Sequence, residues 1–340
     1  MEVEVKESVL MCNYTTLKVG GEARYFVVLN SKDEVEMAGR FAKQTALPFL
    51  VLGSGSNILF SDNGYHGIVF HNQIKGRQYT EDDNDQVTLV CQAGEILDEV
   101  IADTVDRGFW GLENLSAIPG TVGAVPVQNV GAYGVEVSDL ITFVETYDVT
   151  SGVWRKFTRD ECRFGYRDSF FKTSEGRNHI IVAVHFNLQK KPVPKISYAD
   201  LVNYFSDREI TQSAIRKVVV EIRSNKFPDW HETGTAGSFF KNPIISTEDS
   251  EVLLNKYPNL PIYKTSDSKV KISLGYILDK ICNLKGYRKG DVALFDKQAL
   301  VLINLGSQNA AEIKSFSEDI IKKVYNKTGV TIIPEVNIIE

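Results

Sequence analysis

The chain has 340 residues, of which 43% are hydrophobic and 24% charged, and its formal net charge is −6. This length suits two or three domains, and the composition is ordinary for a globular protein in water. An acidic chain without basic blocks is a poor match for nucleic acid, and no apolar run reaches the roughly 20 residues of a membrane span. The charged start MEVEVKES lacks the apolar core of a signal peptide. We therefore expect a cytoplasmic protein with neither nucleic acid nor a membrane as its partner.

The first elements expected are a helix, a strand and a polar loop. Ser31 and Glu34 have the spacing of a capping box, and the helix that they open ends before Pro48. Residues 49–52 (FLVL) are typical of a strand and lead into residues 53–57 (GSGSN), whose backbone N–H groups can form a nest for a phosphate. The dinucleotide fingerprint is excluded, because Ile58 stands where its third glycine is needed. The alternative interpretation of this loop is a simple turn.

A strand at residues 87–92 and a helix with an apolar face at 96–105 precede the most distinctive stretch, residues 113–136 (ENLSAIPGTVGAVPVQNVGAYGVE). Its four glycines and two prolines, without any Lys, Arg or Asp, exclude a regular helix or a central strand. One interpretation is a long surface loop. We favour a backbone cradle for a large, flat, polar cofactor, because amide and hydroxyl side chains stand among the glycines: Thr121, Gln128, Asn129 and Tyr133.

Two strands are expected next, at residues 141–148 and 179–188, and a turn at 163–169 (RFGYRDS) lies between them. Arg167 follows a tyrosine in this glycine-containing turn, and a guanidinium there can bind a carboxylate through two hydrogen bonds. Taken by itself, the turn favours the other interpretation, a surface arginine paired with Asp168.

The C-terminal part is expected to begin after a linker at residues 190–197, with Tyr198 on a loop and a helix capped by Thr211. Within it, the run 234–243 (GTAGSFFKNP) places small residues before Ser238 and two phenylalanines after it. It is not GxSxG and no Ser/His/Asp order is evident, which argues against a hydrolase. Ser238 is either a proton donor or part of a tight turn over the phenylalanines. Helices are expected at 248–256, 274–284 and 309–327, and strands at 299–304 and 330–333.

Two remaining groups of side chains carry little information by themselves. Glu335 follows Pro334 near the end of the chain and would ordinarily be an exposed carboxylate. The four cysteines are far apart and form no CxxC pair, so we expect reduced thiols and neither a disulfide framework nor a metal site.

Five separated motifs, in this order, resemble the UDP-N-acetylenolpyruvoylglucosamine reductases (UDP-N-acetylmuramate dehydrogenases, the MurB family): VLGSGSN, IPGTVGAVPVQNVGAYG, RFGYRDS, GTAGSFFKNP and PEV. The resemblance covers nearly the whole chain. It implies an α+β protein with a two-subdomain FAD-binding module of the vanillyl-alcohol-oxidase (PCMH-like) type and a third, α+β substrate-binding domain. The implied bounds are 1–75 and 76–195 for the FAD-binding subdomains (module about 17–190) and 200–330 for the substrate domain, with 331–340 returning to the active site.

The resemblance also implies roles for individual residues. Ser238 resembles the proton donor, and Arg167 and Glu335 resemble the pair that activates the enolpyruvyl group. The implied FAD-binding residues are Gly53, Ser54, Gly55, Ser56, Asn57, Pro119, Gly120, Thr121, Gly123, Gln128, Asn129, Gly131, Ala132, Tyr133, Gly134 and Arg223. The implied substrate contacts are Tyr166, Tyr198, Lys226, Asn242, Tyr263, Lys271, Lys285 and Gln298. Tyr198 and the chain length are similar to the longer family subtype, whose tyrosine loop folds over the nucleotide. The sequence departs from the family pattern at Ala124-Val125 and at Trp230, where small serines and proline are common.

The activity implied is the NADPH-dependent reduction of UDP-N-acetylglucosamine enolpyruvate to UDP-N-acetylmuramate by a monomer with non-covalent FAD, in peptidoglycan precursor synthesis. A flavin oxidase of the same superfamily often tethers its flavin to a histidine, and none of the five histidines lies in residues 113–136. A catalytically silent nucleotide-sugar binder is expected to lack Ser238, Arg167 or Glu335, and all three are present.

Overall fold

The computed structural model describes residues 3–340, so the first two residues of the expected 1–75 subdomain lie outside the described chain. The chain forms two compact units. The first unit contains residues up to Val9, Ala23–Ser54 and His66–Arg223, and the second contains Leu10–Glu22, Gly55–Tyr65 and Ser224–Glu340. The chain passes from one unit to the other after residues 9, 22, 54, 65 and 223. The subdomain bounds expected from the sequence stay predictions.

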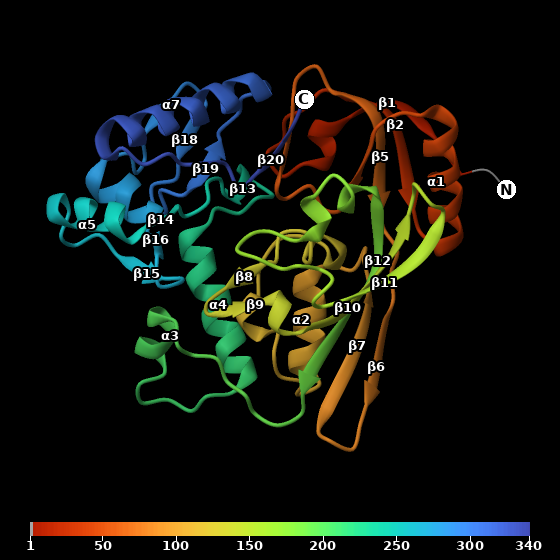
Figure 1. The fold of residues 1–340 in the computed structure, drawn as a ribbon, viewed down its shortest axis with the longest axis horizontal. Helices are drawn as coiled ribbons and strands as arrows, with labels where there is room; N and C mark the ends of the chain where they lie inside the picture. Colours follow the sequence, from red (N-terminus) through yellow and green to blue (C-terminus); the bar gives the residue numbers. More distant parts are fainter. Residues whose placement is uncertain (1–2) are drawn as a thin grey trace. The chain divides into compact units, whose positions relative to one another are not determined.

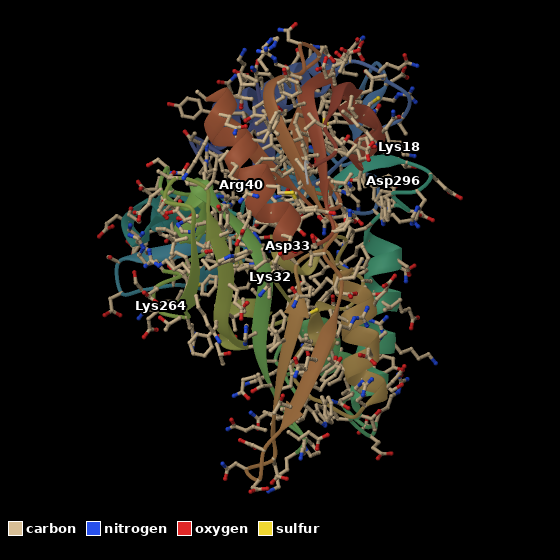
Figure 2. All side chains as sticks on the ribbon, turned by 90° about the vertical axis from the view of Figure 1, so that its right-hand side faces the viewer. Lys18, Lys32, Asp33, Arg40, Lys264 and Asp296 are labelled. Carbon is tan, nitrogen blue, oxygen red and sulfur yellow. The ribbon has the colours of Figure 1, made fainter. Side chains whose placement is uncertain are left out.

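A four-stranded sheet with the order β1-β2-β5-β3 forms part of the first unit. Helix α1 (Lys32–Thr45) lies against this sheet (Figure 1). Val35, Ala38 and Ala42 of α1 share one hydrophobic core with β2 and β5, while Lys32 and Arg40 stay exposed on the helix (Figure 2). The strands are β1 (Lys6–Leu10), β2 (Glu22–Leu29), β3 (Phe49–Leu52) and β5 (Tyr65–Asn72), with β3 and β5 parallel.

The start of α1 follows the sequence prediction with one difference. The Ser31 hydroxyl accepts the N–H of Glu34 at 3.2 Å, as a helix cap should. The Glu34 carboxylate accepts the N–H of Asn30 at 2.5 Å, one residue before the position that closes a capping box. The strand expected at residues 49–52 is confirmed as β3.

The second sheet of the first unit is antiparallel and five-stranded, with the order β11-β10-β12-β7-β6. Strand β12 lies at its centre, and its first eight residues are buried, so the strand expected at residues 179–188 is confirmed. Helix α2 (Leu97–Asp106) packs Leu97, Val100 and Ile101 into the core beside β7 (Figure 1). The strands are β6 (Arg77–Glu81), β7 (Gln86–Gln92), β10 (Ile141–Asp148), β11 (Val153–Thr158) and β12 (His179–Gln189).

Between α2 and β10, residues 113–136 contain only single turns and two-residue strands, so the expected absence of a regular helix or central strand is confirmed for them. These short elements are η2 (Glu113–Leu115), η3 (Val122–Ala124), β8 (Gly131–Ala132) and β9 (Val135–Glu136). Further single turns are η1 (Met11–Tyr14), η4 (Val137–Asp139), η5 (Phe170–Lys172) and η6 (Gly176–Asn178).

The linker expected at residues 190–197 has neither helix nor strand. It leads to the short helix α3 (Ala199–Tyr204) and then to α4 (Gln212–Lys226). The Thr211 hydroxyl accepts the N–H of Ala214 at 3.1 Å, which confirms the predicted cap of α4.

The second unit joins two small antiparallel sheets, with the orders β13-β19-β18-β17 and β14-β16-β15, to the helices α5 and α7. Helix α7 (Ala310–Thr328) covers β18 and β19 (Figure 1). Leu17, Val19 and Leu59 enter the same core from the two early segments of the chain. The other elements are β13 (Gly234–Ser238), β14 (Ile244–Ser246), α5 (Thr247–Lys256), β15 (Ile262–Lys264), β16 (Lys269–Ile272), β17 (Arg288–Lys289), β18 (Val292–Leu294) and β19 (Val301–Asn304).

Two expectations for this unit need correction: the helix expected at 274–284 forms only over residues 274–281, and the strand expected at 330–333 is wrong. The helix expected over 274–284 is a single turn, α6 (Leu274–Tyr276), that continues as a π-helix, η7 (Ile277–Ile281). The strand expected at 330–333 does not form, because Pro334 has no N–H and the segment makes only an isolated bridge to Phe240. The last strand is instead β20 (Asn337–Ile339), which pairs in parallel with β4 (Ile58–Phe60).

Among residues 3–340, no helix is both long and apolar enough to cross a membrane.

Candidate functional site

We call residues 117–134 the glycine cradle. Its backbone turns sharply, with positive φ at Gly120 (139°) and Gly134 (84°), and also at Ala117, Asn129 and Tyr133, where side chains seldom tolerate it. The side-chain amide of Asn129 stabilises this conformation from within, because it donates to Glu136 at 2.8 Å and accepts the N–H of Ser138 at 3.1 Å. The cradle is therefore a shaped backbone surface.

The cradle lies directly on the end of strand β7. The N–H of Gly123 donates to the carbonyl of Ala93 at 2.8 Å, and that of Val122 donates to the carbonyl of Glu95 at 2.8 Å. A Cβ atom at Gly123 would lie 2.6 Å from the Cβ of Ala93, so only glycine allows this close approach.

The loop predicted to bind pyrophosphate meets the cradle at its first residue. A Cβ atom at Gly53 would lie 2.2 Å from the hydroxyl oxygen of Thr121, so the Gly53 backbone packs directly against the Thr121 side chain. Gly53 and Ser54 belong to the first unit, whereas residues 55–57 belong to the second. In the second unit, Gly55 (φ 63°) is equally confined, because a Cβ atom there would lie 1.9 Å from the carbonyl oxygen of Tyr14.

The turn that carries Arg167 is also attached to the cradle. The Arg167 guanidinium donates to the carbonyl of Gly131 at 3.0 Å, and Asn129 donates to the carbonyl of Gly165 at 3.1 Å. Arg167 is half-buried and its φ is +53°. Arg167 is therefore not a purely surface side chain, and its proposed role stays a prediction. Tyr166 lies beside it in the same turn, with the Arg167 guanidinium 5.8 Å from the centre of its ring.

Helix α4 and the segment before it bring two more predicted residues to the cradle. Nε of Arg223 donates to the carbonyl of Ala117 at 3.1 Å, and burial lowers the pKa of its guanidinium even though Tyr133 partly offsets that effect. The rings of Tyr198 and Tyr133 meet edge to face with their centres 5.1 Å apart.

Two residues of the same neighbourhood were not identified from the sequence. Asp98 of α2 accepts the N–H of Ala117 at 2.6 Å and forms a bidentate ion pair with Arg216 of α4 at 2.6 and 2.9 Å. Burial alone would raise the pKa of the Asp98 carboxyl, but the hydrogen bonds from Arg216 and Ala117 outweigh it and lower the pKa. Asn114 is the second missed residue. No pattern in the sequence marks either one, because both act on backbone groups or on partners distant in sequence.

In the second unit, Ser238 and Glu335 lie on neighbouring segments. Ser238 is the last residue of β13, and the buried Phe239 and Phe240 follow it. The N–H of Glu335 donates to the carbonyl of Phe239 at 2.7 Å. The chain end and the segment after Ser238 therefore run side by side, which sequence reasoning expected only from the resemblance.

Asn57 joins this group from the early part of the chain. Its side-chain amide donates to the carbonyl of Glu335 at 3.4 Å, and its own carbonyl accepts the N–H of Asn337 at 3.1 Å. Asn242 lies four residues after Ser238 and accepts the N–H of Leu274 through its side-chain oxygen at 3.0 Å.

The remaining predicted substrate contacts also lie in the second unit. Lys271 of β16 stands opposite Tyr263 of β15, with its ammonium 5.7 Å from the tyrosine ring centre. Gln298 accepts the N–H of Leu300 at 3.3 Å, and the Lys285 ammonium lies 3.8 Å from the Asp279 carboxylate. Lys226 is the last residue of α4. The predicted residues thus fall into one group in each unit.

Comparison with known proteins shows which family the chain resembles. Residues 23–158 match the model of an FAD binding domain, and residues 229–339 match that of the UDP-N-acetylenolpyruvoylglucosamine reductase C-terminal domain. The UDP-N-acetylenolpyruvoylglucosamine reductase of Pseudomonas putida is 37% identical, over 99% of this chain and 100% of its own. That of Porphyromonas gingivalis is 40% identical over 85% of both chains. The chain belongs to the UDP-N-acetylenolpyruvoylglucosamine reductase family. The predicted family is confirmed.

A solved structure supports the same fold. UDP-N-acetylenolpyruvylglucosamine reductase (MurB) from Thermus caldophilus matches this chain with a TM-score of 0.67 at 24% identity, over all of both chains. Together with the two family models, this likeness confirms the predicted α+β fold with an FAD-binding module and a reductase C-terminal domain.

The residues of the cradle fit FAD, the cofactor that the family uses. A large planar ring needs a shaped backbone surface, and the confined glycines at 53 and 123 let the start of the GSGSN loop and the end of β7 pack directly against the cradle that would form this surface. An anionic diphosphate needs donors and positive charge, and the half-buried Arg223 guanidinium lies beside Ala117 at the start of the cradle.

Proposed function

We propose that this protein reduces UDP-N-acetylglucosamine enolpyruvate to UDP-N-acetylmuramate with NADPH and non-covalent FAD, as a step of peptidoglycan precursor synthesis. Family membership over nearly the whole chain is the observation that carries this proposal. FAD, when bound, supplies a centre that accepts a hydride from NADPH and gives one to the enol ether.

The side chains of the protein would supply the proton and stabilise the negative charge of the substrate. Reduction of the enolpyruvyl double bond adds a hydride to one carbon and a proton to the next. Ser238 is the proposed source of that proton, a general-acid role that typically contributes about 10²- to 10⁴-fold in rate. Arg167 would stabilise the negative charge that develops on the substrate carboxylate, because its guanidinium is already held in place by the cradle.

Glu335 is proposed to act on the same carboxylate, and the hydrogen bonds on either side of it support this role. Its N–H and its carbonyl are both committed to neighbouring segments, to Phe239 and to Asn57. The backbone at Glu335 is therefore anchored at two points, which limits the positions that its carboxylate can take.

The other predicted residues complete the proposed binding site. Residues 53–57, the cradle and Arg223 would hold FAD. Tyr198, Lys226 and Asn242 would contact the diphosphate and sugar of the substrate, with Tyr166, Tyr263, Lys271, Lys285 and Gln298 around them. Since the substrate and NADPH are both cytoplasmic metabolites, we place the enzyme in the cytoplasm, as a monomer without nucleic-acid or membrane partners.

The proposal is tested with the purified protein. We expect the absorption bands of bound oxidised flavin, release of all the colour into the supernatant on acid precipitation, and NADPH oxidation that depends on the enolpyruvyl substrate. Mass spectrometry should show a product heavier by two hydrogens. Colour that stays in the pellet would indicate a covalent flavin, as in an oxidase. A yellow protein that consumes no NADPH with this substrate would favour a silent binder.

A further inference from the structure

Asn114 is fully buried and holds two backbone carbonyls at once. Its side-chain nitrogen donates to the carbonyl of Tyr133 at 2.8 Å and to the carbonyl of Lys195 at 2.7 Å. Only the NH₂ end of an amide can donate two hydrogen bonds, so these two carbonyls determine the orientation of the side chain. Its oxygen is buried and has no hydrogen-bond partner among residues 3–340. The Asn114 side chain therefore acts as a hydrogen-bond donor through its nitrogen.

The two carbonyls belong to segments of different kinds. Tyr133 is part of the cradle, at a positive φ of 48°. Lys195 is part of the linker without helix or strand that leads to Tyr198. Lys195 is exposed, so without Asn114 its carbonyl would pair with solvent and the linker would lose this hydrogen bond to the rest of the first unit.

The linker also touches the cradle beyond Lys195. A Cβ atom at Gly134 would lie 3.1 Å from the hydroxyl oxygen of Ser197, so the two segments are in close contact there. One residue further, the Tyr198 ring meets the Tyr133 ring edge to face while 42% of Tyr198 stays exposed. Asn114 thus holds the start of a segment that ends in a partly exposed tyrosine.

We infer that Asn114 is a positioning residue for Tyr198: its amide holds the segment at residues 195–198 on the glycine cradle, so that Tyr198 stands ready for the substrate. This inference rests on the proposed function, in which Tyr198 contacts the nucleotide. Asn114 itself touches backbone and would act only through Tyr198. Loss of its two hydrogen bonds should let residues 195–198 move away from the cradle more often. The residues of the cradle itself would be unchanged.

Limited trypsin digestion tests the tether without any substrate. Trypsin cleaves after lysine by attack on the lysine carbonyl, and the carbonyl of Lys195 is the one that Asn114 holds. In Asn114→Leu, cleavage after Lys195 should be at least about fivefold faster, because the hydrogen bond to the Lys195 carbonyl no longer opposes opening of the segment. Cleavage after the exposed Lys264 (Figure 2), in the second unit, is the internal reference and should not change.

A matched control separates this effect from the general loss of a buried amide. Asn72 is also buried in the first unit, where it donates to the carbonyl of Ile181 at 2.8 Å and accepts the N–H of Ile74 at 3.2 Å. Asn72→Leu should leave cleavage after Lys195 at the wild-type rate. If Asn114→Leu does not yield folded protein, Asn114→Ser, which retains one donor, should give a smaller acceleration of the same cleavage.

Kinetics then test the role of the tether. We expect the KM for the UDP-sugar to rise at least about fivefold in the Asn114 variants, with flavin reduction by NADPH within about twofold of wild type. If trypsin cleaves after Lys195 at the wild-type rate in both Asn114→Leu and Asn114→Ser, the inference is overturned. This result does not depend on which reaction the protein catalyses. An unchanged KM with faster cleavage overturns the positioning role. Failure of the proposed function has a different signature, because the wild-type protein itself would then not turn over the substrate.

Discussion

One hydroxyl group at residue 238 separates the two halves of the proposed reaction. Hydride transfer from NADPH to the flavin needs no proton delivered to carbon, whereas reduction of the enol ether does. In Ser238→Ala, we expect near-normal flavin reduction by NADPH, but reoxidation by the enolpyruvyl substrate slowed by at least about two orders of magnitude. Stopped-flow absorbance of the flavin measures each half separately.

The conservative variant sharpens this experiment. Ser238→Cys should retain part of the second half-reaction, because a thiol can also donate a proton. Reoxidation of Ser238→Ala at the wild-type rate would leave Ser238 as a residue of the strand end and make Glu335 the next candidate for the proton.

Glu113 predicts a dependence of stability on pH. Its side chain is 1% exposed, accepts the N–H of Gly111 at 2.7 Å, and has a pKa that burial raises. The folded protein therefore binds the proton of Glu113 more tightly than the unfolded chain does. This contribution to stability is fully present below the unfolded pKa of about 4.3 and is lost as pH rises through the folded value.

Glu113→Gln should abolish this contribution to the pH dependence and make the protein more stable than wild type on the alkaline side. Thermal unfolding of both proteins across a series of pH values provides the measurement. A stability difference that does not change with pH would show that Glu113 has the same pKa in the folded and unfolded states.

Among the elements, helices α2 and α4 are joined by the Asp98–Arg216 pair. The pair is bidentate, and Asp98 also accepts the N–H of Ala117. Arg216→Met keeps most of the side-chain volume but leaves Asp98 without its cation, so we expect a loss of about 1–3 kcal/mol in the free energy of unfolding. Denaturant titration measures it.

An exposed pair is the control for this variant. Arg40 of α1 is exposed (Figure 2) and lies 3.8 Å from the partly exposed Glu36, so Arg40→Met should cost only about 0–1 kcal/mol. Equal losses in the two variants would mean that the Asp98–Arg216 pair stabilises the unit no more than a surface ion pair does.

Elements that depend on residues close in the sequence could be predicted. Elements that depend on a partner far away in the sequence could not. The cap at Ser31, the buried β12 and the cap at Thr211 depend on neighbouring residues, and all were predicted. Strand β20 was missed because its partner, β4, lies near the other end of the chain. A strand was expected at 330–333 because those residues are apolar, although Pro334 prevents a continuous ladder.

The same distinction applies to the site. Glycine-rich runs and the motif around Ser238 are local patterns, so the sequence indicated them. Asn114 and Asp98 were missed because their roles come from backbone groups that only the fold brings to them. A buried asparagine that holds two carbonyls has no sequence signature.

At the scale of the whole molecule, the second unit depends on segments from the start of the chain. Leu17, Val19 and Leu59 are at most 1% exposed in its core, and each buried side chain of this kind contributes about 1.5–3 kcal/mol. Together they approach the whole stability of a typical domain, about 5–15 kcal/mol. Residues 224–340 alone should therefore show no cooperative thermal transition, and co-expression with residues 1–223 should restore one. Circular dichroism of the isolated fragment is the measurement, and a sharp transition there would contradict this account.

The pairing of β4 with β20 also means that β4 is synthesised long before its partner strand. Ile58 pairs with Asn337, a partner made about 280 residues later. At about 5–20 residues per second, the ribosome needs roughly 15–55 s to make the intervening chain. During that time the apolar strand β4 has emerged without its partner, and the edge of such a strand attracts other chains. The second unit can be completed only when residues 337–339 have left the ribosome, so nascent chains of this enzyme should bind chaperones that shield apolar segments until then.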